Sequence, residues 1–253
     1  MKKTLALIYS YTSYLVGLGA ILYTIGFVGD FLVPKTINSG VPGNPRRAVL
    51  VNLGLLALFG IQHSLMARPQ FKSWWSEILP KPFQRSTYVL LTSAVLSTLF
   101  WLWQPLPRRL WNLQSIWLKI PLWTLYALGW GLVFLSARMI NSGHFFGIQQ
   151  IKEYAQEKRL TSPAFQTPGL YRFIRHPLMA GFLIAFWAAP EMTAGRMLLA
   201  LGLTAYILLA LKFEERDLVR RFGERYRRYR KQVPMFLPRL DAVLGSLRKK
   251  QSQ

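Results

Sequence analysis

The chain has 253 residues, of which 52% are hydrophobic and only 17% are charged, and its formal net charge is +22. It contains no cysteine, which excludes disulfide frameworks, thiolate zinc sites and cysteine nucleophiles. Its three histidines are far apart in sequence and its carboxylates are few, so a metal site is not expected.

Four long charge-free runs come first along the chain. They contain 26 residues between Lys3 and Asp30, 20 between Arg47 and Arg68, 22 between Arg85 and Arg108, and 18 between Lys119 and Arg138. As helices rising about 1.5 Å per residue, runs of these lengths match a hydrocarbon core of about 30 Å. A soluble helical protein would interrupt them with a polar face. The sequence therefore predicts a multi-pass membrane protein.

Two shorter uncharged runs follow, His176–Pro190 and Met197–Leu211, each of 15 residues. As helices they reach only about 22 Å, so each crosses obliquely, takes length from its flanks, or forms a hairpin that enters part of the bilayer. We expect an all-α polytopic bundle with about six membrane segments, the last two forming a short hairpin.

The stretch "KFEERDLVRRFGERYRRYRKQVP" follows the hairpin and predicts a continuing amphipathic helix. Its apolar residues recur every three or four positions opposite a face of arginines, so we expect it on the membrane surface or on the protein's own cytoplasmic face. By composition, the chain divides into apolar transmembrane helices (1–140), a region where polar residues cluster (141–240) and a basic tail (241–253).

The distribution of positive charge predicts the orientation. With a cytoplasmic N-terminus and six crossings, 25 lysines and arginines lie inside and 7 outside, in keeping with the positive-inside rule. The net charge therefore indicates topology and contact with anionic lipids. Nucleic-acid binding is the competing interpretation, but no recognition motif accompanies the charge, and no obligate protein partner is evident. We expect a protein of the bacterial inner membrane.

Polar groups close to the cytoplasmic ends of the segments are the candidates for chemistry, because their desolvation requires a partner or a ligand. The first group is Tyr171, Arg172, Arg175, His176 and Pro177, in front of the hairpin. One interpretation is snorkelling arginines with a proline in the first helical turn. The other is a helix N-terminus whose free N–H groups and positive dipole end suit an anionic ligand group.

The second group is Glu214 and Glu215, just beyond the far end of the hairpin. If the hairpin closes, these carboxylates face His176 and the arginines across a short gap. Adjacent side chains project about 100° apart on a helix, so at most one points into that gap. An ion pair with an arginine and a ligand-binding carboxylate are the two alternatives.

Two further groups lie upstream. In "NSGHFFGIQQ", Gly143 and Gly147 interrupt the helix, and His144, Gln149 and Gln150 can form hydrogen bonds, although a loop with a helix restart explains the same pattern. His63, near the cytoplasmic end of the second run, is either a helix-to-helix partner or part of a cavity wall. Together the four groups predict one cytoplasmic-facing pocket for a small polar ligand. No serine-histidine-acid set, phosphate loop or dinucleotide fingerprint is present.

The order Arg-His-Pro, Glu-Glu, Phe-Gly-x-x-Tyr-x-x-Tyr and Val-Pro, over about 70 residues, resembles the C-terminal signature of the membrane methyltransferases that include isoprenylcysteine carboxyl methyltransferase and the NnrU-like proteins. The pieces "QHSLMARPQFKSWW", "RSTYVL" and "FFGIQQ" resemble more narrowly the methanethiol S-methyltransferases. The resemblance implies S-adenosylmethionine as cofactor, a small volatile thiol as acceptor and dimethyl sulfide as product. Region 141–240 would then be the cofactor-binding part.

The resemblance also implies roles for individual residues. The cofactor-binding positions that it implies are Gln150, Tyr171, His176, Pro177, Leu178, Met179, Glu214 and Glu215. The arginine that meets the substrate carboxylate in the prenylcysteine enzymes corresponds to Ala210 here, which favours a neutral thiol over a carboxylate acceptor.

For the chemistry, the methyl carbon of a sulfonium is attacked in line, and a nearby base or positive field helps a thiol to react as thiolate. His63 or His144 is the candidate base and Arg175 the candidate source of the field. The alternatives are a prenylcysteine, phospholipid or other lipid acceptor, or a non-enzymatic NnrU-like membrane protein.

Overall fold

A computed structural model of the chain describes residues 2–140, 143, 146–160 and 164–238. His144 and the predicted basic tail 241–253 lie outside these residues. The described elements, in chain order, are α1 (Lys2–Gly29), α2 (Pro45–Ala67), α3 (Pro69–Trp75), α4 (Lys81–Leu102), β1 (Arg109–Asn112), α5 (Ile116–Met139), α7 (Ile148–Ala155), the short 3-10 helix η1 (Gly169–Arg172), α8 (Pro177–Trp187), β2 (Glu191–Thr193), α9 (Ala194–Phe222) and α10 (Glu224–Gln232).

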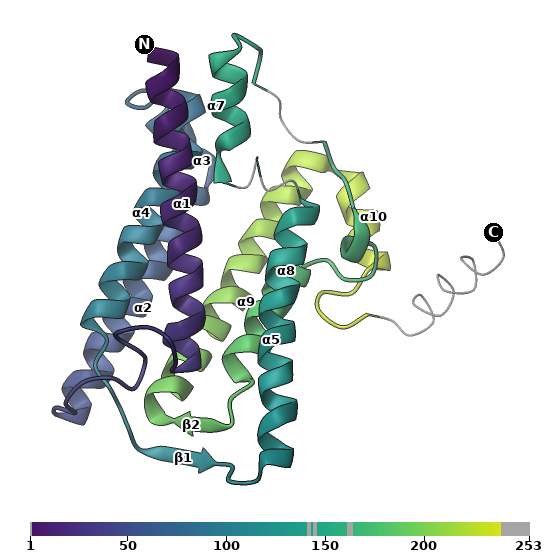
Figure 1. The fold of residues 1–253 in the computed structure, drawn as a ribbon. Coiled ribbons are helices and arrows are strands. Elements are labelled where there is room, and N and C mark those ends of the chain that lie inside the picture. Colours follow the sequence, from purple (N-terminus) through teal and green to yellow (C-terminus); the bar gives the residue numbers. More distant parts are fainter. Residues whose placement is uncertain (1, 141–142, 144–145, 161–163, 239–253) are drawn as a thin grey trace.

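Six helices, α1, α2, α4, α5, α8 and α9, run roughly along one axis, and their connections alternate between the two ends of the bundle (Figure 1). The upper end in Figure 1 carries α3, α7 and α10, and the lower end carries β1 and β2. Helix α4 packs on α1, α2 and α7, and α1 also packs on α7. Helix α5 packs on α8, and α9 bridges the two groups by packing on α2 and α8. The predicted helical bundle is therefore found.

Four described helices, α1, α2, α5 and α9, are long and apolar enough to cross a membrane. Helix α4 covers the third predicted segment with 22 residues but is less apolar, because serines and threonines interrupt it, and α8 has only 11 residues. The expected count of about six membrane segments is thus not confirmed, although a helix is found at each predicted position.

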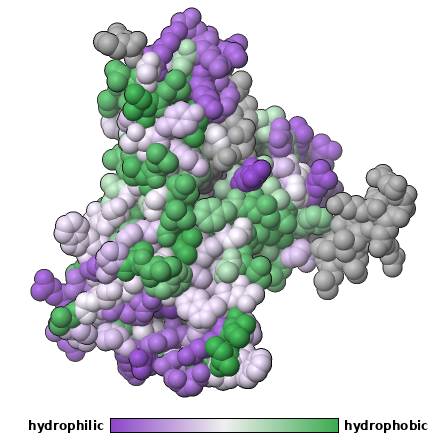
Figure 2. Space-filling view, viewed as in Figure 1, coloured by the Kyte–Doolittle hydropathy of each residue, from purple (hydrophilic) through white to green (hydrophobic). Residues whose placement is uncertain are grey.

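The outer faces of these helices are apolar. Leu15, Leu50, Leu128 and Leu209 are each more than half exposed. Figure 2 shows hydrophobic side chains mainly across the middle of the visible face and hydrophilic side chains mainly toward its upper and lower ends. Such a surface is unfavourable in water and suited to a bilayer, because lipid tails replace the water that these side chains would otherwise order.

Two differences from the sequence-based expectation concern local structure. The first is a two-stranded antiparallel ribbon, in which Trp111 of β1 is paired with Met192 of β2. The second is that the helix predicted to run through "KFEERDLVRRFGERYRRYRKQVP" is broken: α9 ends at Phe222, Gly223 adopts a φ of 58°, and α10 starts at Glu224. Glycine tolerates this left-handed φ, so the chain can change direction there.

The apolar stripe predicted for this C-terminal stretch packs on the protein itself. The ring of Phe165 contacts the rings of Phe222, Tyr226 and Tyr229, with centroids 5.4 to 5.8 Å apart. These three rings of the stripe therefore pack on another part of the protein.

Helices α5 and α8 approach each other through glycines. A Cβ atom on Gly129 would lie 2.8 Å from the backbone nitrogen of Ala185, and one on Gly181 would lie 2.6 Å from the carbonyl oxygen of Gly129. Backbone atoms cannot give way like flexible side chains, so only glycine allows this separation. Close contact through small residues is a common way for helices to associate in membranes.

We predict that Gly129→Ala lowers the free energy of unfolding by about 2 kcal/mol, because the added methyl group forces α5 and α8 apart. Gly131→Ala is the matched control, since a Cβ atom there meets nothing within 4 Å. Thermal unfolding of the purified variants in detergent measures the difference. Equal melting temperatures for the two variants would contradict the prediction.

Candidate functional site

A cavity of about 940 Å³ lies between the helices, with walls from α1, α2, α4, α5, α8, α9 and α10. Its volume is within the range of pockets that hold drug-sized ligands. Its deep part is apolar, with Phe27, Leu99, Trp130 and Phe186 among the lining residues. At the other end, near the start of α4 and the end of α9, the walls carry polar and basic groups. The cavity therefore offers one polar and one apolar environment to whatever it binds.

The hairpin α8–α9 positions the centre of the polar part. Oε1 of Glu215 accepts hydrogen bonds from Nε of Arg175 at 2.7 Å and from Nε2 of His176 at 3.1 Å. All three side chains are at least nine-tenths buried. The predicted meeting of His176 with the glutamate pair is thus found, and Glu215 forms an ion pair with an arginine, which is one of the two alternatives for it.

The C-terminal segment is hydrogen-bonded to the start of α8, beside this ion pair. The backbone N–H groups of Arg175 and His176 donate to the carbonyl oxygens of Pro234 and Met235, at 2.9 and 3.2 Å. The guanidinium of Arg175 also donates to the carbonyl oxygens of Arg230 and Val233. Residues far apart in sequence therefore fix the N-terminus of α8 from two sides. We call these contacts, with the Glu215 ion pair, the clamp.

Glu214 differs from its neighbour in having no such partner. Its side chain lines the cavity and is exposed to solvent there. In the part of the chain that the structure describes, no donor lies within hydrogen-bonding or ion-pairing distance of its carboxylate. This is the division that the 100° offset predicts, with one glutamate in the gap and the other turned away.

Tyr171 faces the same space. Its hydroxyl is buried and has no hydrogen-bond partner among the described residues, while its carbonyl oxygen accepts from the hydroxyl of Tyr229 at 2.6 Å. Burial, reinforced by the negative charge of Glu214, raises the pKa of Tyr171, so the phenol keeps its proton. Burial also raises the pKa of Tyr229 to about 12. Tyr171 therefore presents an unused hydrogen-bond donor to the cavity.

The N-terminus of α8 also opens into the cavity. Pro177 occupies the first turn, His176 makes no side-chain cap, and Leu178 and Met179 line the wall. The first N–H groups of a helix have no intrahelical acceptor and carry a partial positive charge. Of the two interpretations of this motif, a helix end available to a ligand is thus compatible with the structure.

Basic side chains surround the polar end of the cavity. We call these the basic rim: Arg68, Lys72, Arg85 and Arg221. Asp217 pairs with Arg68 at 3.2 Å. Burial, followed by the charge of Arg85, lowers the pKa of Lys72, as expected where positive charges crowd. The excess of cations favours a ligand with an anionic group at this end.

A second polar group faces the cavity from α2 and α4. The hydroxyl of Tyr88 lies 2.8 Å from Nε2 of His63, whose ring is stacked on Phe59 with centroids 5.3 Å apart. Thr92 lies one turn further along α4 and also lines the cavity. Both alternatives for His63 are therefore observed, because it is a helix-to-helix partner and part of the cavity wall.

The structure brings most of the predicted site residues to this one cavity. Those that line it are His63, Tyr171, Arg175, His176, Leu178, Met179 and Glu214. Pro177 and Glu215 lie directly behind the wall and position it. Gln150 is on α7 and does not belong to the lining, and the helix restart predicted there is found after Gly147, which has a φ of 94°. The roles of all these residues stay predictions.

Sequence reasoning missed Tyr88, Thr92 and Tyr206, which line the cavity beside His63. One signal was available: Tyr88 and Thr92 are polar residues four positions apart in a charge-free run, so they share one helix face. The partner helix could not be inferred from that spacing.

The chain is similar in sequence to several known proteins and matches one protein family. The family described as NnrU protein matches residues 51–245. The chain is 50% identical over 238 residues to methanethiol S-methyltransferase 2 of Bradyrhizobium diazoefficiens, covering 93% of this chain and 91% of that protein. It is 48% identical over 238 residues to methanethiol S-methyltransferase of Mycobacterium tuberculosis, covering 94% and 98%. It is 34% identical over 177 residues to nurim of Sus scrofa, covering 66% of each. No solved structure matches. The resemblance described from the sequence motifs is confirmed.

We predict that Glu215→Gln lowers the free energy of unfolding by about 3 kcal/mol, because it leaves Arg175 charged and buried without its counter-ion. Glu224→Gln, which removes an exposed ion pair with Arg227, should change it by less than about 0.5 kcal/mol. Urea unfolding followed by tryptophan fluorescence gives both values. Loss of the clamp should also make the segment after Gly223 more sensitive to protease, and unchanged cleavage in Glu215→Gln would count against the clamp.

Proposed function

The chain belongs to the NnrU family, and from this premise we propose that it is a membrane methyltransferase that uses S-adenosylmethionine to convert methanethiol to dimethyl sulfide. Relatives with 48 to 50% identity over almost the whole chain carry the name methanethiol S-methyltransferase. The observation that carries the proposal is the pairing of an unpartnered carboxylate and an unpartnered hydroxyl, on Glu214 and Tyr171, in one cavity with an apolar interior.

The residues present fit S-adenosylmethionine. Its hydroxyl and ammonium groups are hydrogen-bond donors, and the carboxylate of Glu214 can accept hydrogen bonds from them. Its carboxylate suits the hydroxyl of Tyr171, the N-terminus of α8 at Leu178 and Met179, and the basic rim. His176, Pro177 and Glu215 act in this proposal by holding that helix end in place. A contact from Gln150 on α7 is part of the proposal only as an inference from the family motif.

Bound S-adenosylmethionine supplies a methyl carbon that an acceptor sulfur attacks in line. The protein's task is to hold the acceptor at near-attack distance and to exclude water. The aromatic and aliphatic wall of the deep cavity excludes water. Its apolar character also suits a small neutral thiol, and Ala210 lines the cavity where a cation would favour a carboxylate acceptor.

The acceptor thiol must lose its proton as the new carbon–sulfur bond forms. We propose that a ring nitrogen of His63 accepts this proton, with the hydroxyl of Tyr88 orienting the ring from 2.8 Å. His144 stays an alternative base outside the described residues. Arg175 can add a positive field, although its ion pair with Glu215 offsets part of its charge.

For the orientation, we propose that all six long-axis helices cross or enter the bilayer, with the end that carries α3, α7 and α10 in the cytoplasm. The alternation of the connections in Figure 1 supports six passages, and the concentration of lysines and arginines at that end supports the direction. The cofactor would then enter from the cytoplasm of a bacterial cell, and lipids would surround the apolar faces.

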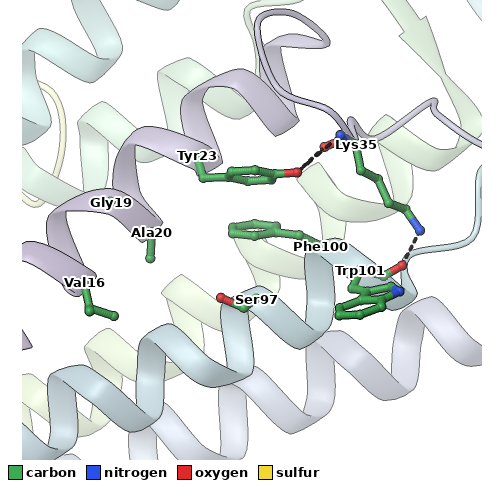
Figure 3. Close-up of a pocket in the computed structure, with 8 residues that line it drawn as sticks. All are labelled: Val16, Gly19, Ala20, Tyr23, Lys35, Ser97, Phe100 and Trp101. Carbon is green, nitrogen blue, oxygen red and sulfur yellow. Dashed lines mark hydrogen bonds between the residues drawn. The ribbon is translucent and has the colours of Figure 1, made fainter.

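A lipid acceptor is the second candidate, because the outer surface has a groove of about 430 Å³ between α1 and α4 (Figure 3). A groove open to the bilayer is what a prenylcysteine or phospholipid acceptor would require. Methanethiol is favoured over such acceptors by the names of the relatives and because Ala20 and Phe100 separate the groove from the cavity.

We predict that bacterial cells expressing the chain and fed methanethiol release dimethyl sulfide above the level of an empty-vector control. Headspace gas chromatography measures it directly. The reason is that the volatile product leaves the membrane without a carrier. Well-expressed protein with no dimethyl sulfide above the control would shift the proposal to a lipid acceptor or to a non-enzymatic membrane protein.

We predict that Glu214→Gln weakens S-adenosylmethionine binding by about tenfold, since a charge-assisted hydrogen bond to the cofactor is lost. Tyr171→Phe should weaken binding in the same direction by removing a donor. Isothermal titration calorimetry on the detergent-purified protein measures both, and Glu224→Gln is the exposed control. Wild-type affinity in both cavity variants would rule out this cofactor position.

A further inference from the structure

We infer that methanethiol reaches the cavity from the bilayer through the groove between α1 and α4, by passing between Ala20 and Phe100. This inference rests on the proposed function for the identity of the acceptor. The passage itself is argued from the shape of the protein and is tested separately below.

Figure 3 shows the residues that line the groove. Its floor is made of small side chains, Gly19 and Ala20 on α1 and Ser97 on α4, with Val16 at one end. At the other end the rings of Tyr23 and Phe100 are stacked with centroids 4.8 Å apart. Lys35 and Trp101 close that end, and the Lys35 amine donates to the carbonyl oxygen of Trp101. Among the described residues that line the groove, Lys35 is the one charged residue and lies at its end, so most of the lining suits a neutral apolar molecule.

The groove and the internal cavity share a wall. Ala20 and Phe100 line both, the former on α1 and the latter on α4. One methyl group and one aromatic ring therefore separate bilayer from cavity at this point. Closer to the N-terminus of α1, helices α1 and α4 are in tight contact, because a Cβ atom on Gly17 would lie 2.5 Å from a methyl carbon of Val89.

The wall is arranged so that a side chain can open it while the helices stay in place. Tyr23 is fixed, since its hydroxyl bonds both the carbonyl oxygen and the amide nitrogen of Lys35. Phe100 has no hydrogen-bonding group in its side chain. Its ring contacts those of Tyr23 and Phe27, and it packs in the apolar core through nonpolar contacts. Rotation of one phenyl ring admits a molecule with two heavy atoms, whereas a lipid chain would require the two helices to separate.

A continuous face of α4 leads inward from this wall. Phe100, Leu96, Thr92 and Tyr88 follow one another at intervals of four residues, and all line the cavity. Four-residue spacing keeps them on one side of the helix, over a rise of about 18 Å. The face is apolar at Phe100 and Leu96 and polar at Tyr88, where it meets His63. A thiol moving along it would arrive at the proposed base.

The absence of cysteine from the chain allows a direct test. Thr92→Cys places one thiol on the inward path. In protein reconstituted in phospholipid nanodiscs, this thiol is labelled with methyl methanethiosulfonate, which transfers a group the size of methanethiol. Gly19→Leu fills the groove, since a Cβ atom there meets nothing within 4 Å. Gly54→Leu on α2 is the matched control, because a Cβ atom there also meets nothing.

Mass spectrometry over time gives the labelling rate. We expect Gly19→Leu to slow labelling of the Thr92→Cys protein by about tenfold, because entry is gated at the groove, and Gly54→Leu to leave the rate unchanged. Equal rates in the two leucine variants would overturn the passage. If Thr92→Cys does not fold, Leu96→Cys replaces it on the same face. Dimethyl sulfide formation by the unmodified chain is measured in parallel, so slowed labelling without any product would count against the proposed function and leave the passage standing.

In the enzyme assay, the same Gly19→Leu variant should lower kcat/KM for methanethiol by about tenfold and leave the Kd of S-adenosylmethionine unchanged. The decrease should be larger for 1-propanethiol than for methanethiol. Phe100→Leu, which thins the wall, should act in the opposite direction on 1-propanethiol. If Gly19→Leu weakened S-adenosylmethionine binding as much as it lowered kcat/KM for methanethiol, the variant would be generally destabilised and the inference would be overturned.

Discussion

The buried ion pair between Glu215 and Arg175, shared with His176, is the interaction on which the rest of the site depends. It joins the start of α8 to the end of α9, so the short hairpin closes on itself. Two buried charges are stable only when they are paired and hydrogen-bonded, and Arg175 meets this condition with the carbonyl oxygens of Arg230 and Val233. Because Glu215 is used in this way, Glu214 is turned into the cavity with its carboxylate free.

The cavity has one polar and one apolar end, and the proposed reaction between a charged methyl donor and a volatile thiol needs both. Glu214, Tyr171 and the N-terminus of α8 form the polar end, which faces the same side as the basic rim. The apolar end lies among the aromatic rings of α1, α4 and α8. Neither environment could be built by one helix alone, since each helix contributes only one stripe of side chains. The site therefore requires the two helix groups to be joined by α9.

Much of this arrangement could be predicted from the sequence, for physical reasons. The length of each uncharged run determined where helices form, and two short runs flanked by charge predicted the hairpin that brings His176 to Glu215. Pairings between distant segments were not predictable: the ribbon of β1 with β2, and Tyr88 against His63, depend on how helices are placed side by side. Gly223 could have been identified, because glycine after a run of helix-forming residues commonly ends a helix.

The contacts of Arg175 and His176 with Pro234 and Met235 have a consequence for how the protein is made. During synthesis the long apolar helices α1, α2, α5 and α9 can form and pack before the last of these partners leaves the ribosome. Until then the start of α8 lacks two of its backbone hydrogen bonds, and the ring of Phe165 lacks Tyr226 and Tyr229. The site is therefore completed only after the segment from Tyr226 to Met235 has been made, so a chain interrupted before this segment would lack the contacts that hold the start of α8.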